Sequence, residues 1–227
     1  MEILDNTRLY RTILSSEGFR NYFADIREIG GRLLYYETGE DLRSPGKDFL
    51  YYLYKGRCKV STVSANGKTH IVNTLKGPCL VGEIEFITGG EAYKVSTLEG
   101  SYVIEIDLLR YRNALLHDSC FLRALCKELA AKEKNSSIRM INSFAYPLKN
   151  RLAGFIIDYA EDDVFRIKKT VIAESLGVSY RHLEKVMDEF VKAGYLDKKG
   201  LIYRLSDRST LAKLARELEM ANIRQQK

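Results

Sequence analysis

The chain has 227 residues, of which 45% are hydrophobic and 29% charged, and a formal net charge of +6, which is ordinary for a soluble globular protein. The segment Met1–Tyr10 has no apolar signal-peptide core, and no run of about 18 apolar residues occurs. We therefore expect a cytoplasmic protein without a membrane span. The cysteines show no CxxC spacing, which favours incidental thiols and leaves a redox or metal role open for Cys58, Cys79, Cys120 and Cys126.

The N-terminal half changes from a helical to a β pattern. Residues 7–25 carry apolar side chains at helical spacing, which predicts short helices. From residue 26 to 107, short segments rich in Val, Ile, Leu, Tyr and Thr alternate with glycine-containing turns. The segments are RLLYYE, FLYYLY, CKVSTV, HIVNTL, KVSTL and YVIEI. Their hairpin spacing predicts an antiparallel sandwich or barrel.

A long helix is predicted in the middle of the chain. From residue 108 to 144 apolar residues recur at three- and four-residue intervals without proline, and Pro147 marks a boundary. A helix of about 25 residues after Asp118 would be about 37 Å long. One interpretation is a core helix of a single domain. The other, which we favour, is a seam between two chains formed by Leu122, Leu125 and Leu129.

The C-terminal part has its own sequence of short elements. Residues 148–159 predict an amphipathic helix, KKGLIYRLSD predicts two strands that turn at Lys199-Gly200, and residues 209–220 predict a final helix. This part is basic, because residues 146–227 carry 16 Lys or Arg against 12 Asp or Glu. The surplus is compatible with a polyanionic partner.

The segment Val171–Phe190 reads as a helix-turn-helix. Two short helical patterns meet at Gly177, where a turn with positive φ is expected, and Ala173 is small where the two helices would cross. Ser179 is a suitable N-cap for the second helix. The apolar positions that would face a shared core are Ile172, Leu176, Val178, Leu183 and Val186.

Polar and basic side chains gather where a recognition helix enters the major groove. Arginine there can donate two hydrogen bonds to guanine. Lysines and hydroxyls that flank the first helix, or lie on the following hairpin, suit phosphate contacts. The predicted DNA-binding residues are Lys168, Lys169, Thr170, Ser179, Tyr180, Arg181, His182, Lys185 and Lys199. A solvated basic surface of a helix pair is the plainer alternative.

From about Leu34 to Ala215 the chain resembles the Crp/Fnr family of bacterial transcription regulators. The resemblance rests on TGEDL, FLYYLYKGRCKV, ANGKTHIVNTL, CLVGEIEFI, the long helix, RLAGFIIDYA and AESLGVSYRHLEKVMDEFVKAGYL. It implies an α+β chain with an N-terminal antiparallel β-roll of the cyclic-nucleotide-binding jelly-roll type (residues 1–117). A long dimerisation helix (residues 118–145) and a winged helix-turn-helix domain (residues 146–227) would follow. The implied partners are double-stranded DNA, a second copy of the chain and RNA polymerase.

Departures from the family pattern concern the ligand. The resemblance implies an effector pocket at Gly82, Glu83, Ser136 and Ser137, but Glu91-Ala92 stand where nucleotide-binding members carry an Arg-Ser pair for the cyclic phosphate. A carboxylate repels a phosphate, so we expect an unidentified effector other than cyclic AMP or cyclic GMP. No further cofactor or metal is evident. Arg181 stands where members that read the usual half-site carry a glutamate, so a different DNA sequence is expected.

Two other functions compete with DNA binding. A cupin-like metal enzyme needs clustered histidines, whereas His70, His117 and His182 fall in three different patterns. A cyclic-nucleotide-type signalling module without DNA binding would not need the helix-turn-helix. We therefore expect a transcription regulator that binds a palindromic operator as a homodimer and has no catalytic activity.

Overall fold

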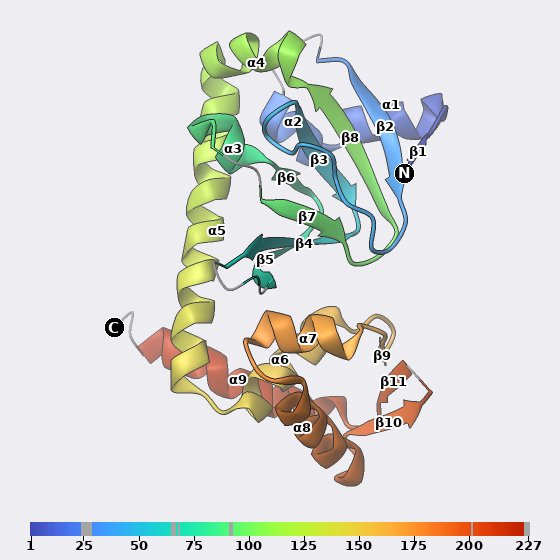
Figure 1. The fold of residues 1–227 in the computed structure, drawn as a ribbon, viewed down its shortest axis with the longest axis vertical. Coiled ribbons are helices and arrows are strands. Elements are labelled where there is room, and N and C mark those ends of the chain that lie inside the picture. Colours follow the sequence, from blue (N-terminus) through green and yellow to red (C-terminus); the bar gives the residue numbers. More distant parts are fainter. Residues whose placement is uncertain (24–28, 65–66, 68, 91–92, 201, 225–227) are drawn as a thin grey trace. The chain divides into compact units, whose positions relative to one another are not determined.

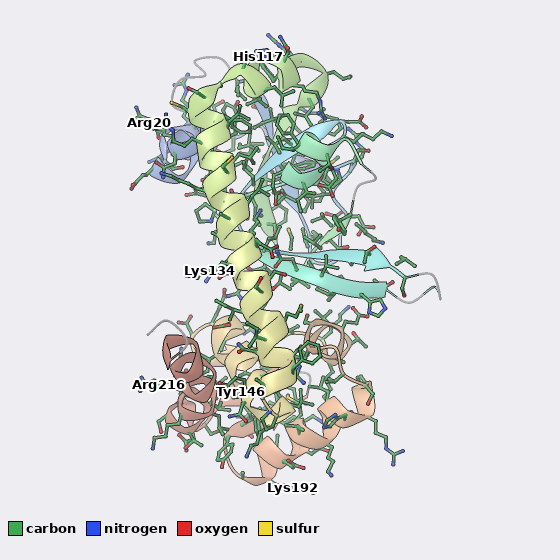
Figure 2. The ribbon with its side chains drawn as sticks, turned by 90° about the vertical axis from the view of Figure 1, so that its left-hand side faces the viewer. Arg20, His117, Lys134, Tyr146, Lys192 and Arg216 are labelled. Carbon is green, nitrogen blue, oxygen red and sulfur yellow. The ribbon has the colours of Figure 1, made fainter. Side chains whose placement is uncertain are left out.

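The computed structural model describes residues 1–23, 29–64, 67, 69–90, 93–200 and 202–224 (Figure 1). The chain divides into two compact units, Met1–Glu133 and Lys134–Lys227. The boundary lies within helix α5 (Ser119–Ala145), and Lys134, the first residue of the second unit, is labelled on this helix in Figure 2.

The first unit contains two antiparallel sheets. One sheet has the order β1-β2-β8-β3-β6, and the other has the order β5-β4-β7. The strands of the larger sheet are β1 (Glu2–Ile3), β2 (Gly31–Tyr36), β3 (Phe49–Lys55), β6 (Cys79–Val81) and β8 (Ser101–Asp107). Those of the smaller sheet are β4 (Arg57–Val63), β5 (Thr69–Lys76) and β7 (Lys94–Thr97). Together they form the expected jelly-roll-like domain.

Side chains that alternate along a strand of the larger sheet contribute to two different hydrophobic cores. In β3, Leu50 and Tyr52 face a core that also holds Phe121, whereas Tyr51 and Leu53 face the core between the two sheets. Successive side chains of a strand point to opposite faces, so a strand buried on both faces reads as the continuous apolar run FLYYLY.

Helices cover the outer face of the larger sheet. These are α1 (Thr7–Ser15), α2 (Glu17–Phe23), α4 (Leu108–His117) and the first turns of α5. Ile13, Phe19 and Phe23 pack there against Phe121 and Leu125 of α5. The sheet therefore holds the start of α5 through a continuous hydrophobic core.

The second unit is built around a three-helix core and a small sheet. Helices α6 (Leu148–Tyr159), α7 (Lys169–Leu176) and α8 (Tyr180–Lys192) pack with the sheet β10-β11-β9 and with α9 (Arg208–Arg224). The strands are β9 (Val164–Phe165), β10 (Leu196–Lys199) and β11 (Ile202–Leu205). This is the expected helix-turn-helix with its hairpin, and α6 has the bounds that its sequence predicts.

Four elements are absent from the sequence-based prediction: β1, β6, β9 and α3 (Glu83–Thr88). Each has six residues or fewer, which is too short for a periodic apolar pattern. The last helix is longer than the predicted range 209–220. Part of the predicted helical range 7–25 and of the β range that starts at residue 26 lies outside the described residues.

Two glycines meet where β6 enters α3. Gly82 has φ 91°, and a Cβ atom on it would lie 2.3 Å from the backbone nitrogen of Gly46. Gly39 has nearly the same φ, 90°, but a Cβ atom there would meet nothing within 4 Å. An alanine would be strained by the positive φ at both positions, but only at Gly82 would its Cβ atom also clash with a neighbour.

We expect Gly82→Ala to lower the free energy of unfolding by about 1–3 kcal/mol more than Gly39→Ala, because only Gly82 adds overpacking to the strain of a positive φ. Urea unfolding of both variants measures this difference. Equal losses would contradict the close approach of Gly46 and Gly82.

Candidate nucleic-acid interface

The turn between α7 and α8 is closed by a left-handed glycine. Gly177 has φ 64° and ψ 38°. The N–H of Val178 donates to the carbonyl of Ala173 at 3.0 Å, and the N–H of Gly177 donates to the carbonyl of Glu174 at 3.4 Å. These two bonds form a Schellman motif, which satisfies the last carbonyls of α7 and fixes the direction in which the chain leaves it.

Ser179 starts α8 as predicted. Its hydroxyl oxygen accepts a hydrogen bond from the N–H of His182 at 3.2 Å, and its own backbone is extended. The helix then buries one face in the core of the unit, through Leu183, Val186, Met187 and Phe190. The cap and the buried face together determine which side chains of α8 point to solvent.

The solvent face of α8 is cationic over its first turns and mixed in charge further along, where Asp188 and Glu189 are exposed as well. Arg181, Lys185 and Lys192 are exposed at helical spacing opposite the buried face, with Asp188 between them. Tyr180, 46% exposed, and His182 flank this stripe at the first turn. The structure therefore brings together the four residues predicted on α8: Tyr180, Arg181, His182 and Lys185. The sequence analysis missed Lys192, which lies at the far end of the helix (Figure 2).

Lys169 connects the two helices of the motif. Its ammonium Nζ lies 2.9 Å from Oε1 of Glu184 on α8. Burial alone would lower the pKa of Lys169, but hydrogen bonds to Glu184 and Tyr203 raise it above its ordinary value. The bond from Lys169 lowers the pKa of the Glu184 carboxyl, with a further hydrogen bond from Tyr180. Lys169 thus fixes α7 against α8 and is less accessible than the prediction of a phosphate contact implies.

The other residues predicted to contact phosphate are exposed at the ends of two elements, the start of α7 and the end of β10. Lys168 and Thr170 are exposed at the start of α7, which has no side-chain cap. Early N–H groups of such a helix are available to an anion. Lys199 is exposed at the end of β10, paired with Ile202 of β11, and its neighbour Lys198 is exposed as well.

A residue that sequence reasoning missed supports the turn from behind. Nη1 of Arg151 on α6 donates to the carbonyl of Leu176 at the end of α7, at 2.8 Å. Burial lowers the pKa of the Arg151 guanidinium. The sequence carries no signal for this contact, because a basic residue on an amphipathic helix is ordinarily solvated.

The residues predicted for an effector pocket are divided between the two units. Gly82 and Glu83 lie together at the start of α3 in the first unit, whereas Ser136 and Ser137 lie on α5 in the second. The carboxylate of Glu83 is buried and bound to the ammonium of Lys132, which sequence reasoning did not identify. Glu91-Ala92 lie outside the described residues.

The predicted seam on α5 requires a correction. Leu125 is only 1% exposed and packs with Phe121 in the core of its own unit, so it offers no surface to a second chain. The sequence pattern assigns it to the seam because a helix face that packs on a sheet and one that packs on another chain have the same apolar spacing. Leu122 and Leu129 are partly buried at the edge of that core.

Potential metal ligands are scattered over the described part of the chain. There, His, Cys, Asp and Glu side chains form no group of three or more that could hold a metal ion. None of the described helices combines the length and apolar composition that a membrane span requires.

Comparison with known proteins gives matches over both units. Residues 33–118 match the family described as cyclic nucleotide-binding domain, and residues 150–214 match the Crp-like helix-turn-helix domain. The chain is 33% identical over 212 residues to the regulatory protein YeiL of Escherichia coli O157:H7, covering 92% of this chain and 97% of that protein.

Solved structures have the same fold. A transcriptional regulator of the Crp/Fnr family from Thermus thermophilus superposes with a TM-score of 0.69 at 18% identity, over 81% of this chain and 97% of the other. FixK2 from Bradyrhizobium japonicum superposes with a TM-score of 0.66 at 15% identity, over 82% and 97%.

We expect Ser179→Ala to lower the free energy of unfolding by about 1 kcal/mol, because an early N–H of α8 loses its acceptor. Ser179→Asn is the matched control, since its side-chain oxygen can cap the helix and preserve stability. Urea unfolding of the full chain measures both. The assigned cap is wrong if the alanine variant is as stable as the asparagine variant.

Proposed function

Because the chain belongs to the Crp/Fnr family of transcription regulators, we propose that it binds a palindromic DNA operator as a homodimer, with α8 as the recognition helix. The proposal includes modulation by an effector other than cyclic AMP, contact with RNA polymerase, a cytoplasmic location and no catalytic activity. Residues 1–117 would form the effector-type domain, residues 118–145 the dimerisation helix, and residues 146–227 the DNA-binding domain.

The observation that carries the proposal is the solvent face of α8. The cap at Ser179 and the buried apolar face leave Arg181 and Lys185 exposed on the first turns. That part of a recognition helix contacts base edges in the major groove. Arg181 can donate two parallel hydrogen bonds to O6 and N7 of a guanine, and no carboxylate partner of Arg181 is found among the described residues.

Phosphate contacts would fix the position of α8 on the duplex. Lys168 and Thr170 at the start of α7 and Lys199 on the hairpin are exposed, so their side chains can reach the backbone on either side of the groove. Lys169 supports the interface through its bond to Glu184, which stabilises the angle between the two helices.

A stripe of α5 residues supports the homodimer. Leu122, Cys126, Leu129, Met140 and Phe144 fall near one face of this helix, broadly following the three- and four-residue intervals of a helical seam. Met140 is 65% exposed and Phe144 is 84% exposed. Large apolar side chains exposed to water on one helix face favour a partner that covers them. We propose this stripe, without Leu125, as the dimer seam.

The proposal that the effector is not a cyclic nucleotide is based on the acidic residues of the predicted pocket. The predicted site offers the carboxylate of Glu83, which is already bound to Lys132, and Glu91 replaces the phosphate-binding arginine of the family pattern. A cyclic nucleotide would bring its phosphate towards acidic residues, which supports an effector of another kind.

We expect Arg181→Ala to lose about 1–3 kcal/mol of discrimination at one base pair per half-site, because a bidentate contact to guanine is removed. Affinity for unrelated duplexes should fall much less. Titration of a bound duplex and its single-base-pair variants measures the profile. Arg216→Ala makes the same charge change on α9 and is the control. It should leave the discrimination between base pairs unchanged. An equal loss on every sequence would instead assign Arg181 to phosphate.

We expect mild oxidation to link two chains through Cys126, since equivalent seam positions of parallel helices approach within the ~7 Å that a disulfide allows. Non-reducing electrophoresis should show a product of twice the 26.0 kDa chain. Cys126→Ser should abolish it and Cys120→Ser should not. A dimer in sedimentation that never cross-links through Cys126 would move the seam elsewhere.

A further inference from the structure

A buried ammonium group lies at the turn where the sequence predicts an effector pocket. Nζ of Lys132 on α5 lies 2.7 Å from Oε1 of Glu83, 2.6 Å from Oε1 of Glu128 and 2.8 Å from the carbonyl oxygen of Leu80. A lysine ammonium has three N–H donors, and all three find acceptors here. The side chain of Lys132 is only 16% exposed, and those of both glutamates are less exposed still.

The second carboxylate is itself held in place. Glu128 accepts a hydrogen bond from the N–H of Leu80 at 3.0 Å and another from the hydroxyl of Tyr22 on α2. The site is therefore assembled from α2, β6, α3 and α5. Two of its three acceptors, Glu128 and the carbonyl of Leu80, are held by neighbours other than the ammonium. Such fixed acceptors are a feature of a binding site.

The electrostatics of this site favour a cation. Burial raises the pKa of the Glu83 carboxyl, and the Lys132 ammonium acts in the opposite direction. Burial alone would lower the pKa of Lys132, but the two carboxylates outweigh it and raise that pKa. Without the ammonium, two buried like charges would face each other, which is unfavourable.

We propose that the Gly82–Glu83 turn is a primary-ammonium site whose resident ligand is the chain's own Lys132. The ammonium closes the β-roll onto the first half of α5 without a small molecule at Glu83. Because the lysine is tethered, its effective concentration at the site is high. Glu83 would repel an anionic effector at this turn, and a cationic one must compete with Lys132. The proposal concerns the first unit and is independent of DNA binding.

The test is chemical rescue of the full-length protein. Lys132→Ala removes three methylene groups and the ammonium, and n-propylammonium supplies the same atoms. We expect hydrogen exchange of the amides in Cys79–Thr88 to become roughly 100-fold faster in Lys132→Ala. Tens of millimolar n-propylammonium chloride should restore protection in that variant.

Three controls isolate the ammonium. Tetramethylammonium chloride carries the same charge without N–H donors and should restore nothing. Lys132→Met fills the space with an apolar chain, so n-propylammonium should not rescue it. Lys134→Ala removes an exposed lysine of the same helix (Figure 2) and should leave exchange unchanged.

Each outcome decides the proposal. If Lys132→Ala does not fold alone, recovery of folded protein in n-propylammonium and not in tetramethylammonium is the expected result. Wild-type exchange rates in Lys132→Ala, or a loss that neither salt reverses, would overturn it. None of these readouts uses DNA, so failure here leaves the proposed recognition by α8 untouched.

Discussion

A left-handed glycine and a serine cap fix where helix α7 ends and helix α8 begins. Neither α7 nor α8 is long enough to be stable alone, so tertiary contacts must define where each begins and ends. The backbone bonds at Gly177 end α7, Arg151 supports that end from α6, and Ser179 restarts the chain as α8 two residues later. Burial of the opposite face of α8 then leaves Arg181 and Lys185 directed to solvent. The proposed contact of α8 with a base depends on this local geometry, because a rotation of α8 would bury the cations.

In the first unit a buried ammonium helps to attach α5 to the sheet. Its double-sided sheet buries the start of α5 through Phe121 and Leu125, and the ammonium of Lys132 continues that attachment further along the helix. Three acceptors surround the ammonium, so the pair tolerates burial that an isolated charge would not. One of these acceptors, Glu83, lies at the turn where the family pattern implies a nucleotide pocket. The family fold is thus retained, and at this turn Glu83 binds an ammonium of the chain itself.

Much of the fold could be predicted from sequence, and the exceptions have physical reasons. Glycine turns and apolar runs located most strands, and Pro147 located the boundary before α6, because these signals are local. The elements β1, β6, β9 and α3 are too short to show a period. Leu125 falls on the predicted seam because spacing identifies an apolar face and not its partner. The partners of Glu83 and Lys169 depend on residues 49 and 15 positions away, which no local pattern reveals.

The central claim is that α8 reads one specific DNA half-site, presented twice by a dimer. Selection of bound duplexes from a random pool with the full-length protein tests it most directly. The account predicts enrichment of a palindrome whose half-site centres lie about one helical turn apart, ~34–36 Å. A pool that stays unenriched, or an enriched sequence without two-fold symmetry, would contradict it.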